Sequence, residues 1–270
     1  MKLPVIDTDL AKRLERSELE YITSRISSIG ERSGNPEGVE IRKFGGATAF
    51  YTKTMPWRSF NGVVGLTPDD IDQIGGIAEF YRERQRSFEI AVNPCSASPE
   101  LLKALAACGL YQKAFHSVLY GPPSRDMSPL PEHVRIDEVT DEREFGQYAE
   151  IHCVGFGMSA DHKHHFVNNN IGLLHRPGWK FFLARIQETP AAVGVMLISG
   201  GIASFTLAAT APEFRRRGLH TALLHRRMHE AHLAGCELVT AQAGFGSTSQ
   251  NNMERTGMQM AWTRAVWEPL

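Results

Sequence analysis

Residues 215–224 read Arg-Arg-Arg-Gly-Leu-His-Thr-Ala-Leu-Leu, and this basic, glycine-bearing stretch separates an extended run from a helix. Before it, Ala203 to Thr210 has the composition of a buried strand, and Pro212 lacks an amide donor, so strand pairing should end there. After it, apolar residues recur at helical spacing as far as Gly235, a common helix stop. The sequence therefore predicts a strand, a turn and a helix that begins near Gly218.

This turn is predicted to bind an anion. The first amides of a helix have no partner inside the helix and point outward with the positive end of the helix dipole, so they stabilise a phosphate. Arg215, Arg216 and Arg217 add positive charge, and Gly218 lets the backbone approach a ligand closely. The alternative is a solvated basic loop, since short glycine motifs often match by chance. The strand before the turn and the amphipathic helix after it favour anion binding.

The turn resembles the acetyl-CoA signature of the GCN5-related N-acetyltransferases (the GNAT family), Gln/Arg-x-x-Gly-x-Gly/Ala. Arg215, Gly218 and His220 fall on its defined positions, although His220 stands where a small residue is usual. A second motif follows in the family's order: residues 246–258 resemble the last helix of the family, with Gly257-Met258 in place of its Gly-Phe pair. The resemblance covers roughly residues 131–270, about one domain.

The resemblance implies acetyl-CoA as the cosubstrate, with no metal. The end of the strand would offer backbone groups to the pantetheine arm, and the turn and the first helical turn would hold the pyrophosphate. The residues expected to contact acetyl-CoA are Ala208, Ala209, Thr210, Arg215, Arg216, Arg217, Gly218, Leu219 and His220.

Acetyl transfer to an amine also needs a proton for the leaving thiolate. The tyrosine that serves the family as general acid falls here on Met253, whose thioether cannot donate a proton. The proton must then come from water or from a hydroxyl, and Ser249, one turn earlier on the same helix, is the candidate catalytic residue. We also predict that Met253→Tyr is tolerated and does not lower turnover. Ser247 is predicted to cap this helix, because residues 247–250 form a capping-box sequence.

Histidine suits a general base near neutral pH, and the loop after the first helix of the carboxyl half carries several. The fold implied by the resemblance would place this loop near the acceptor. We nevertheless interpret this histidine-rich stretch as a solvated helix surface, because its spacing fixes no metal or catalytic geometry. We interpret the histidines of the 218–234 helix in the same way. The residues concerned are Asp161, His162, His164 and His165 in the loop, and His225, His229 and His232 in the helix.

With 270 residues, 42% of them hydrophobic, the chain can form two domains. Residues 109–120 and 257–268 share one pattern, a glycine that ends a helix and a strand that follows, which indicates two copies of one fold unless the match arises by chance. The proline-rich residues 122–131 have the composition of a linker. We therefore predict a degenerate amino-terminal copy at 1–121 and an acetyl-CoA-binding copy at 132–270.

Secondary-structure signals predict an α/β (α+β) fold for each copy: two tandem GNAT-like domains, each a mixed, mostly antiparallel sheet flanked by helices. In the carboxyl half, strands are expected at 134–139, 181–185, 191–199, 203–210, 237–243 and 260–267, and helices at 141–153, 218–234 and 248–256. In the amino half, strands are expected at 87–92 and 112–120, and a helix at 99–108.

The amino-terminal copy has no Arg-x-x-Gly-x-Gly turn, so it is predicted to have lost acetyl-CoA binding and to shape the acceptor pocket instead. Its loop at residues 55–61 brings an aromatic and an amide together, and we predict that Trp57 and Asn61 bind the acceptor. The alternative is that the aromatic residues of this loop, Trp57 and Phe60, belong to the core.

Composition excludes several classes of protein. The formal net charge of −1 gives no bulk electrostatic attraction for nucleic acid, and no stretch resembles a membrane span or the apolar core of a signal peptide. The four cysteines have no Cys-x-x-Cys spacing and are expected to be small buried hydrophobes in a cytoplasmic protein. The oligomeric state has no signature in the sequence.

The leading hypothesis is an N-acetyltransferase that moves an acetyl group from acetyl-CoA to a primary amine of a small molecule or a peptide. The alternative is an acyl-CoA-binding sensor or scaffold without catalysis, because Met253 and His220 depart from the family pattern. An acyltransferase that uses an RNA-borne donor would need stronger basic surfaces than this chain has.

Overall fold

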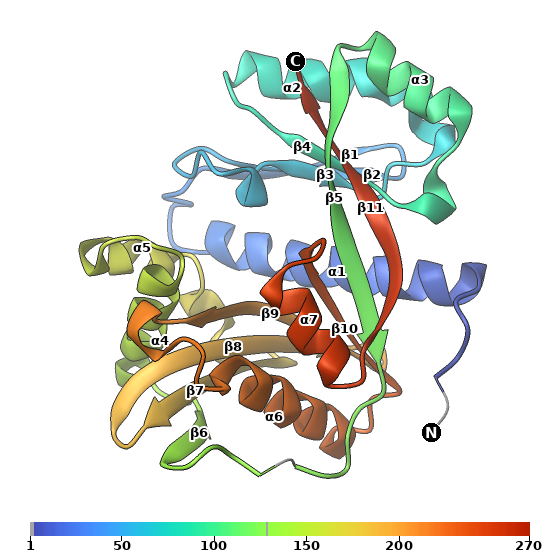
Figure 1. Cartoon of the computed structure of the whole chain (residues 1–270). Coiled ribbons are helices and arrows are strands. Elements are labelled where there is room, and N and C mark those ends of the chain that lie inside the picture. The colour runs from blue at the N-terminus through green and yellow to red at the C-terminus, as the bar shows by residue number, and fades with distance from the viewer. Residues whose placement is uncertain (1–2, 128) are drawn as a thin grey trace. The chain divides into compact units, whose positions relative to one another are not determined.

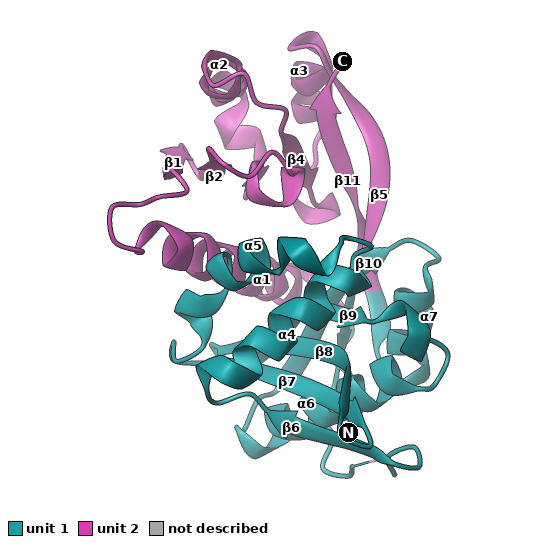
Figure 2. Cartoon of the chain, turned by 90° about the vertical axis from the view of Figure 1, so that its left-hand side faces the viewer, with its two compact units in different colours: residues 1–5, 119–260 teal, residues 6–118, 261–270 magenta. Residues whose placement is uncertain are grey.

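The computed structural model describes residues 3–127 and 129–270 and divides the chain into two compact units. Unit 1 comprises residues 1–5 and 119–260, and unit 2 comprises residues 6–118 and 261–270 (Figure 2). Residues 261–270, assigned from sequence to the carboxyl-terminal domain, thus group with the amino-terminal unit. Each unit is built from two separate segments of the chain.

Unit 1 is a mixed sheet with helices on both faces. Strands β6, β7, β8 and β9 form an antiparallel meander, β10 pairs with β9 in parallel, and the end of β5 lies beside β10. The strands are β6 (Val134–Glu138), β7 (Trp179–Ile186), β8 (Thr189–Ser199), β9 (Ile202–Thr210) and β10 (Leu238–Gly244), and the helices are α4 (Glu142–Gly155), η4 (Ala160–His162), α5 (Lys163–Asn168), η5 (Ile171–Leu173), η6 (Pro212–Phe214), α6 (Leu219–Leu233) and α7 (Thr248–Arg255).

The core of unit 1 lies between this sheet and its helices. Figure 2 shows α4 in front of the sheet and α6 behind it. Apolar side chains of α6, among them Leu223 and Met228, join Phe182, Met196 and Phe205 of the strands in one buried cluster. Buried apolar area of this kind is the main stabilising contribution in a domain, so α6 is held firmly on β8 and β9.

Unit 2 has a related arrangement, in which β11 from the end of the chain lies between β4 and β5. Its strand order is β1-β2-β3-β4-β11-β5; β3 and β4 pair in parallel, and β11 pairs with β4 antiparallel. The elements, labelled in Figure 1, are α1 (Thr8–Gly30), β1 (Val39–Phe44), β2 (Ala47–Thr52), η1 (Arg58–Phe60), β3 (Gly62–Val64), η2 (Pro68–Gln73), α2 (Ile74–Glu83), β4 (Glu89–Val92), η3 (Pro94–Ser96), α3 (Pro99–Ala107), β5 (Leu110–Gly121) and β11 (Gln259–Pro269).

Most elements predicted from sequence are present within a few residues of the predicted bounds, including the meander and the helix that begins at residue 219. The internal repeat is also present in the structure. Gly109 (φ 76°) lies between the end of α3 and the start of β5, and Gly257 (φ 91°) lies between the end of α7 and the start of β11. The loop predicted after the helix that ends at Cys153 contains two short helices, η4 and α5.

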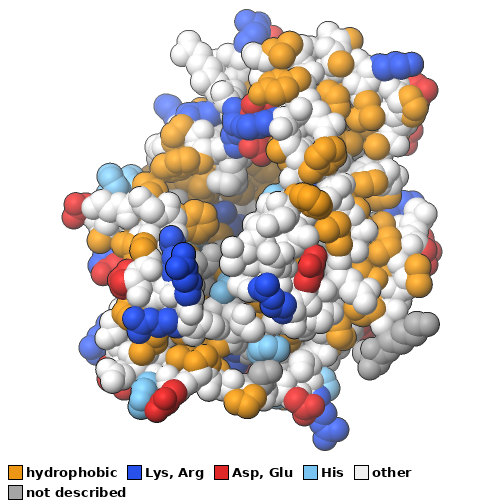
Figure 3. Space-filling view, in the orientation of Figure 1, with side chains coloured by type: hydrophobic (Ala, Val, Ile, Leu, Met, Phe, Trp, Pro, Cys, Tyr) orange, Lys and Arg blue, Asp and Glu red, His pale blue; other side chains and the backbone are white. Residues whose placement is uncertain are grey.

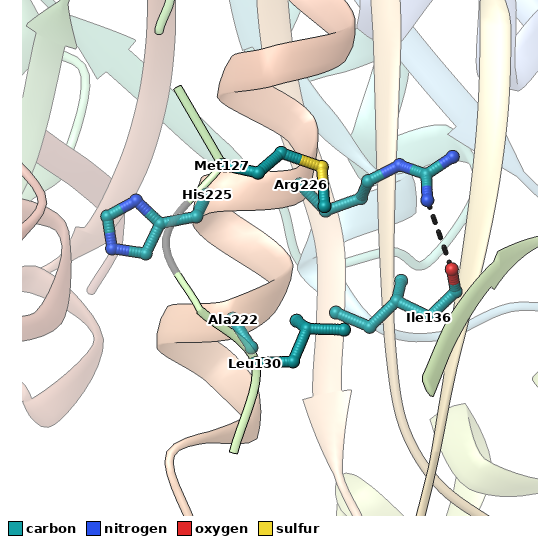
Figure 4. Close-up of a pocket in the computed structure, with 6 residues that line it drawn as sticks. All are labelled: Met127, Leu130, Ile136, Ala222, His225 and Arg226. Atoms are coloured by element: carbon teal, nitrogen blue, oxygen red, sulfur yellow. Dashed lines mark hydrogen bonds between the residues drawn. The ribbon is translucent and has the colours of Figure 1, made fainter. Parts of the chain in front are cut away.

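The proline-rich residues 122–131, described except for residue 128, form no helix or strand, as predicted, but they pack against α6. The amide of Ser124 donates to the Met228 carbonyl (3.0 Å), and Met127 and Leu130 line a small cavity with α6 (Figure 4). In the same view Arg226 donates to the carbonyl of Ile136 at 3.0 Å. These contacts make the segment part of the surface of unit 1.

The cysteines differ in exposure, and the surface charges are mixed. Cys153 and Cys236 are buried as expected, whereas Cys95 and Cys108 are exposed, so their prediction as buried hydrophobes was wrong. On the face shown in Figure 3, Lys and Arg side chains lie in separated groups interspersed with acidic ones. Among the described residues, no helix combines the length and hydropathy needed to cross a membrane.

Candidate functional site

A groove of about 590 Å³ opens in unit 1 where two parallel strands separate. Strands β9 and β10 are paired from Ile202 to Phe205 of β9, and beyond that point β9 continues to Thr210 without this partner. The lining residues come from the ends of α4 and β9, the following turn, and α6 and α7: Gly155, Ala208, Ala209, Thr210, Phe214, Arg215, Arg216, Gly218, Leu219, His220, Thr221, Thr248, Ser249 and Asn252.

The turn into α6 leaves helix amides uncapped at the groove. Gly218 is the N-cap of α6, adopts φ 75°, and has no side chain that could cap the helix. The first α-helical bond at this end runs from the Ala222 amide to the Gly218 carbonyl (2.9 Å), so the three preceding amides lack such partners. Arg216 also adopts a positive φ of 64°, an uncommon conformation for a residue with a side chain. A helix start with free amides at a groove is an arrangement that favours an anion.

The three arginines of the turn play different parts. Arg215 is tied to the backbone, because its Nη2 donates to the Gly155 carbonyl (2.9 Å) and its Nε to the Thr210 carbonyl (3.3 Å). Arg216 lines the groove. The guanidinium of Arg217 lies 5.5 Å from the centre of the Phe214 ring, and Arg217 is not among the lining residues.

His220 occupies the groove as a neutral hydrogen-bonding group. Burial, helped by the charge of Arg227, lowers the pKa of His220 to about 4. Its Nδ1 lies 3.2 Å from the side-chain nitrogen of Asn252 on α7. Because an amide nitrogen only donates, Nδ1 accepts this bond, and the ring proton is on Nε2. His220 therefore joins α6 to α7 and retains one donor.

We expect stability to fall between pH 7.5 and pH 5.0 in part through His220. The folded-state pKa of about 4 lies below the ordinary value of 6.5, so the unfolded chain binds this proton first as the pH falls. The contribution is complete above pH 6.5 and is lost toward pH 4; between pH 7.5 and 5.0 the loss is about 2 kcal/mol. Urea unfolding of the wild type and His220→Gln at both pH values measures it. An equal pH dependence in the two proteins would contradict the assignment.

Helix α7 presents Thr248, Ser249 and Asn252 to the groove. The Ser249 hydroxyl has no hydrogen-bond partner among the described residues, so it is available to a ligand. Ser247 caps α7 as predicted, accepting the Gln250 amide at 3.2 Å. Met253 points away from the groove lining and is only 5% exposed, within the core of unit 1.

The burial of Met253 argues against the expectation that Met253→Tyr is tolerated. The position is in a close-packed core, and a tyrosine ring adds volume and a hydroxyl that would need a partner there. We expect this substitution to lower the free energy of unfolding by about 1–3 kcal/mol. Urea titration measures the loss, with the volume-conserving Met253→Leu as the control, expected within about 1.5 kcal/mol of the wild type. If the Met253→Tyr protein is as stable as the wild type, the core accommodates the larger ring and the predicted loss is contradicted.

The other predicted residues lie outside the groove lining. His162, His164 and His165 are exposed, with the rings of His164 and His165 3.9 Å apart between centres. Among the described residues no group of three or more His, Cys, Asp or Glu is arranged to hold a metal ion. His225 lines the small cavity that Met127 and Leu130 also line, and burial lowers the pKa of His225.

Trp57 and Asn61, both in unit 2, have different environments. Asn61 is fully buried, accepts from the Thr52 amide (3.1 Å) and donates to the carbonyls of Met55 and Trp57 (2.6 and 2.9 Å). These bonds use its side chain to hold the loop, so the structure gives Asn61 a structural role in place of the predicted acceptor contact. Trp57 is 44% exposed and remains the candidate for acceptor binding.

Sequence reasoning missed Gly155, Thr221 and Asn252 as parts of the site. A Cβ on Gly155 would lie 2.7 Å from the Cβ of Ala209, so glycine is required where α4 crosses β9. A glycine at the end of a predicted amphipathic helix is a weak signal for this close approach. Asn252 stands one residue before the family's tyrosine position, and its link to His220 depends on how two helices meet.

Comparison with known proteins identifies the fold. Neither a family model nor a curated protein matches the sequence. A GCN5-related N-acetyltransferase from Kribbella flavida matches with a TM-score of 0.67 at 16% identity, over 95% of this chain and 94% of its own. Another from Sphaerobacter thermophilus matches with a TM-score of 0.60 at 14% identity, over 94% and 91%.

A tandem GNAT protein from the clavulanic acid biosynthesis pathway matches with a TM-score of 0.62 at 11% identity, over 97% of this chain and 96% of its own. At such identities the likeness shows the fold. The predicted α/β fold of the tandem GNAT type is thereby confirmed.

Proposed function

We propose that this protein is an N-acetyltransferase that transfers the acetyl group of acetyl-CoA to a primary amine of a small molecule or a peptide. One observation carries the proposal: a single groove in unit 1 joins the end of β9 that extends beyond its pairing with β10, the left-handed Gly218 turn and the uncapped first turn of α6. The GNAT fold supports it, although fold alone does not fix activity.

The groove fits the parts of acetyl-CoA. The amides of Leu219, His220 and Thr221 and the side chain of Arg216 would face the pyrophosphate, where helix dipole and positive charge favour an anion. Ala208 and Ala209 extend beyond the pairing with β10, so the backbone on this side of β9 would bond the amide groups of the pantetheine arm. The Nε2 proton of His220 adds a donor that the usual small residue cannot supply.

Acetyl transfer requires an uncharged amine to attack the thioester carbonyl and a proton to reach the departing sulfur. The Ser249 hydroxyl is our candidate for supplying that proton, because it lines the groove and has no partner among the described residues. We assign no side chain of the groove as the general base. In unit 2, the exposed Trp57 is our candidate for acceptor binding.

We expect Ser249→Ala to lower kcat by about 100-fold while acetyl-CoA binds with unchanged Kd, since one general acid typically contributes roughly 10²–10⁴-fold. Stopped-flow or steady-state release of free CoA measures the rate, and calorimetry measures the Kd. Asn251→Ala, exposed on the same helix, is the matched control and should retain full activity. Full turnover by Ser249→Ala would assign protonation to water or to another group.

A non-catalytic acyl-CoA sensor is the second candidate function, favoured by the buried Met253 at the family's tyrosine position. A turnover screen separates the two: acetyl-CoA is incubated with the full chain and a library of primary amines, and free CoA is measured. Release of CoA that depends on an amine supports the transferase. Tight binding of acetyl-CoA without release for any amine class supports the sensor.

A further inference from the structure

Unit 2 contains a cavity of about 260 Å³ at the position that corresponds to the groove of unit 1. In each unit the central parallel strands separate after a short paired stretch. Strands β3 and β4 are paired at Gly62–Glu89 and Val63–Ile90, and the cavity begins with the next residues, Val64 and Ala91. Helix α1 covers it with Lys12, Glu15, Arg16, Glu18 and Leu19.

The turn after β3 differs in charge from the turn after β9. Residues 68–73 include three aspartates, and Asp70 accepts the amides of Gly46 (2.7 Å) and Thr67 (3.0 Å). The Asp70 carboxylate therefore occupies the Thr67 amide at the start of this short helix and the Gly46 amide of the β1–β2 turn, and its charge repels a pyrophosphate. A CoA-like ligand is thus disfavoured here. The cavity is also slightly below the roughly 300–1,000 Å³ of pockets for drug-sized ligands.

The charge that lines the cavity is positive and partly unengaged. Glu15 is bonded by the Cys95 thiol (3.0 Å), and Glu18 pairs with Arg264. Lys12 and Arg16 are exposed, lie one helical turn apart on α1, and have no hydrogen bond or ion pair among the described residues. The unpaired cations of Lys12 and Arg16 would attract an anion, whereas the nearby carboxylates of Glu15 and Glu18 would repel one of high charge. The cavity therefore favours an anion of low charge.

The inner wall holds a buried polar cluster. The side chains of Arg264 and Glu18 are 13% and 6% exposed, and Nη2 of Arg264 lies 3.3 Å from Nδ1 of His116. Asn93 accepts from Trp262 Nε1 (3.0 Å), which leaves its own amide nitrogen without a partner among the described residues. A buried ion pair is a poor source of stability, so such a cluster beside a cavity marks a candidate binding site.

We propose that this cavity binds a small organic carboxylate, with the carboxylate held by Lys12, Arg16 and the Asn93 amide and the apolar part against Leu19, Val64 and Ala91. The site is separate from the acetyl-CoA groove and does not depend on the proposed transferase activity. Unit 2 would thus bind a ligand of a different chemical class from the acetyl-CoA proposed for unit 1.

Hexanoate is a suitable probe, with hexanamide as its uncharged match. Saturation-transfer NMR on the full chain at constant ionic strength is expected to show hexanoate binding at millimolar concentration and hexanamide binding at least about tenfold more weakly. The double substitution Lys12→Gln and Arg16→Gln should weaken hexanoate binding about tenfold or more and leave the acetyl-CoA Kd within about twofold of the wild type, since neither side chain lines the groove of unit 1.

Two controls make the result specific. Lys103→Gln removes an exposed cation of unit 2 outside the cavity, and Arg216→Gln removes one from the unit 1 groove; neither should change hexanoate binding. The proposal is overturned if hexanoate does not bind the wild type, if hexanamide binds equally well, or if binding survives the double substitution. Displacement of hexanoate by an equal concentration of inorganic phosphate would likewise overturn the assignment to carboxylates.

Discussion

Replacing Gly218 with valine is expected to weaken acetyl-CoA binding by at least about 100-fold, a loss of roughly 2.8 kcal/mol. The cause is local: Gly218 holds φ 75°, which a β-branched residue resists, and the added side chain would stand beside the uncapped amides of α6. A Cβ at this position meets only Pro131, at an ordinary contact distance of 3.5 Å, so the protein should still fold. Isothermal titration of the folded variant measures the effect.

Gly235 provides a matched control at the other end of the same helix. It follows α6 with φ 71° and has open space around its Cβ position, so Gly235→Val imposes a similar backbone strain away from the groove. We expect both variants to lose similar stability and only Gly218→Val to lose acetyl-CoA. Equal, undiminished binding in both would reduce the turn to a solvated basic loop.

Arg227→Ala is expected to lower the free energy of unfolding by about 3–5 kcal/mol. Arg227 is 1% exposed inside unit 1, and burial lowers its pKa to about 9, so the side chain is still charged near neutral pH. Its Nη1 donates to the Val195 carbonyl (3.1 Å) at the irregular register between Val193 and Val195, and its guanidinium lies over the Phe205 ring. Truncation would leave a large cavity and an unpaired carbonyl.

Urea unfolding tests this prediction, with two comparisons. Arg227→Met keeps much of the volume and should lose less stability than the alanine variant. His232→Ala, exposed on the same helix, should stay within about 0.5 kcal/mol of the wild type. A loss below about 1 kcal/mol for Arg227→Ala would show that water or neighbouring groups replace its bonds.

The parts of the site that sequence predicted are those that depend on neighbouring residues. The strand, the Gly218 turn and α6 follow one another in the chain, and each has a local signature in proline, glycine or apolar spacing. The capping of α7 by Ser247 is local for the same reason. These features could be predicted because the physics that forms them acts over a few residues.

The remaining features depend on residues that are distant in sequence. The pairing of β11 with β4 joins residues 265–267 to 90–92, and no local pattern specifies that partner. Asn61 looks like an exposed loop amide until its three hydrogen bonds are seen. The burial of Met253 and the bond between His220 and Asn252 likewise depend on how α6, α7 and the sheet meet.

Calorimetric titration of the full chain with acetyl-CoA at pH 7.5 and low salt tests the central claim most directly. The predicted result is one saturable site per chain with a Kd between about 1 µM and 1 mM, the usual range for enzyme substrates, and an affinity that weakens with added salt. The full chain is the right material because unit 1 includes residues 119–130 as well as those that follow. The absence of saturable binding at about 1 mM acetyl-CoA would contradict the claim that this groove holds the cosubstrate.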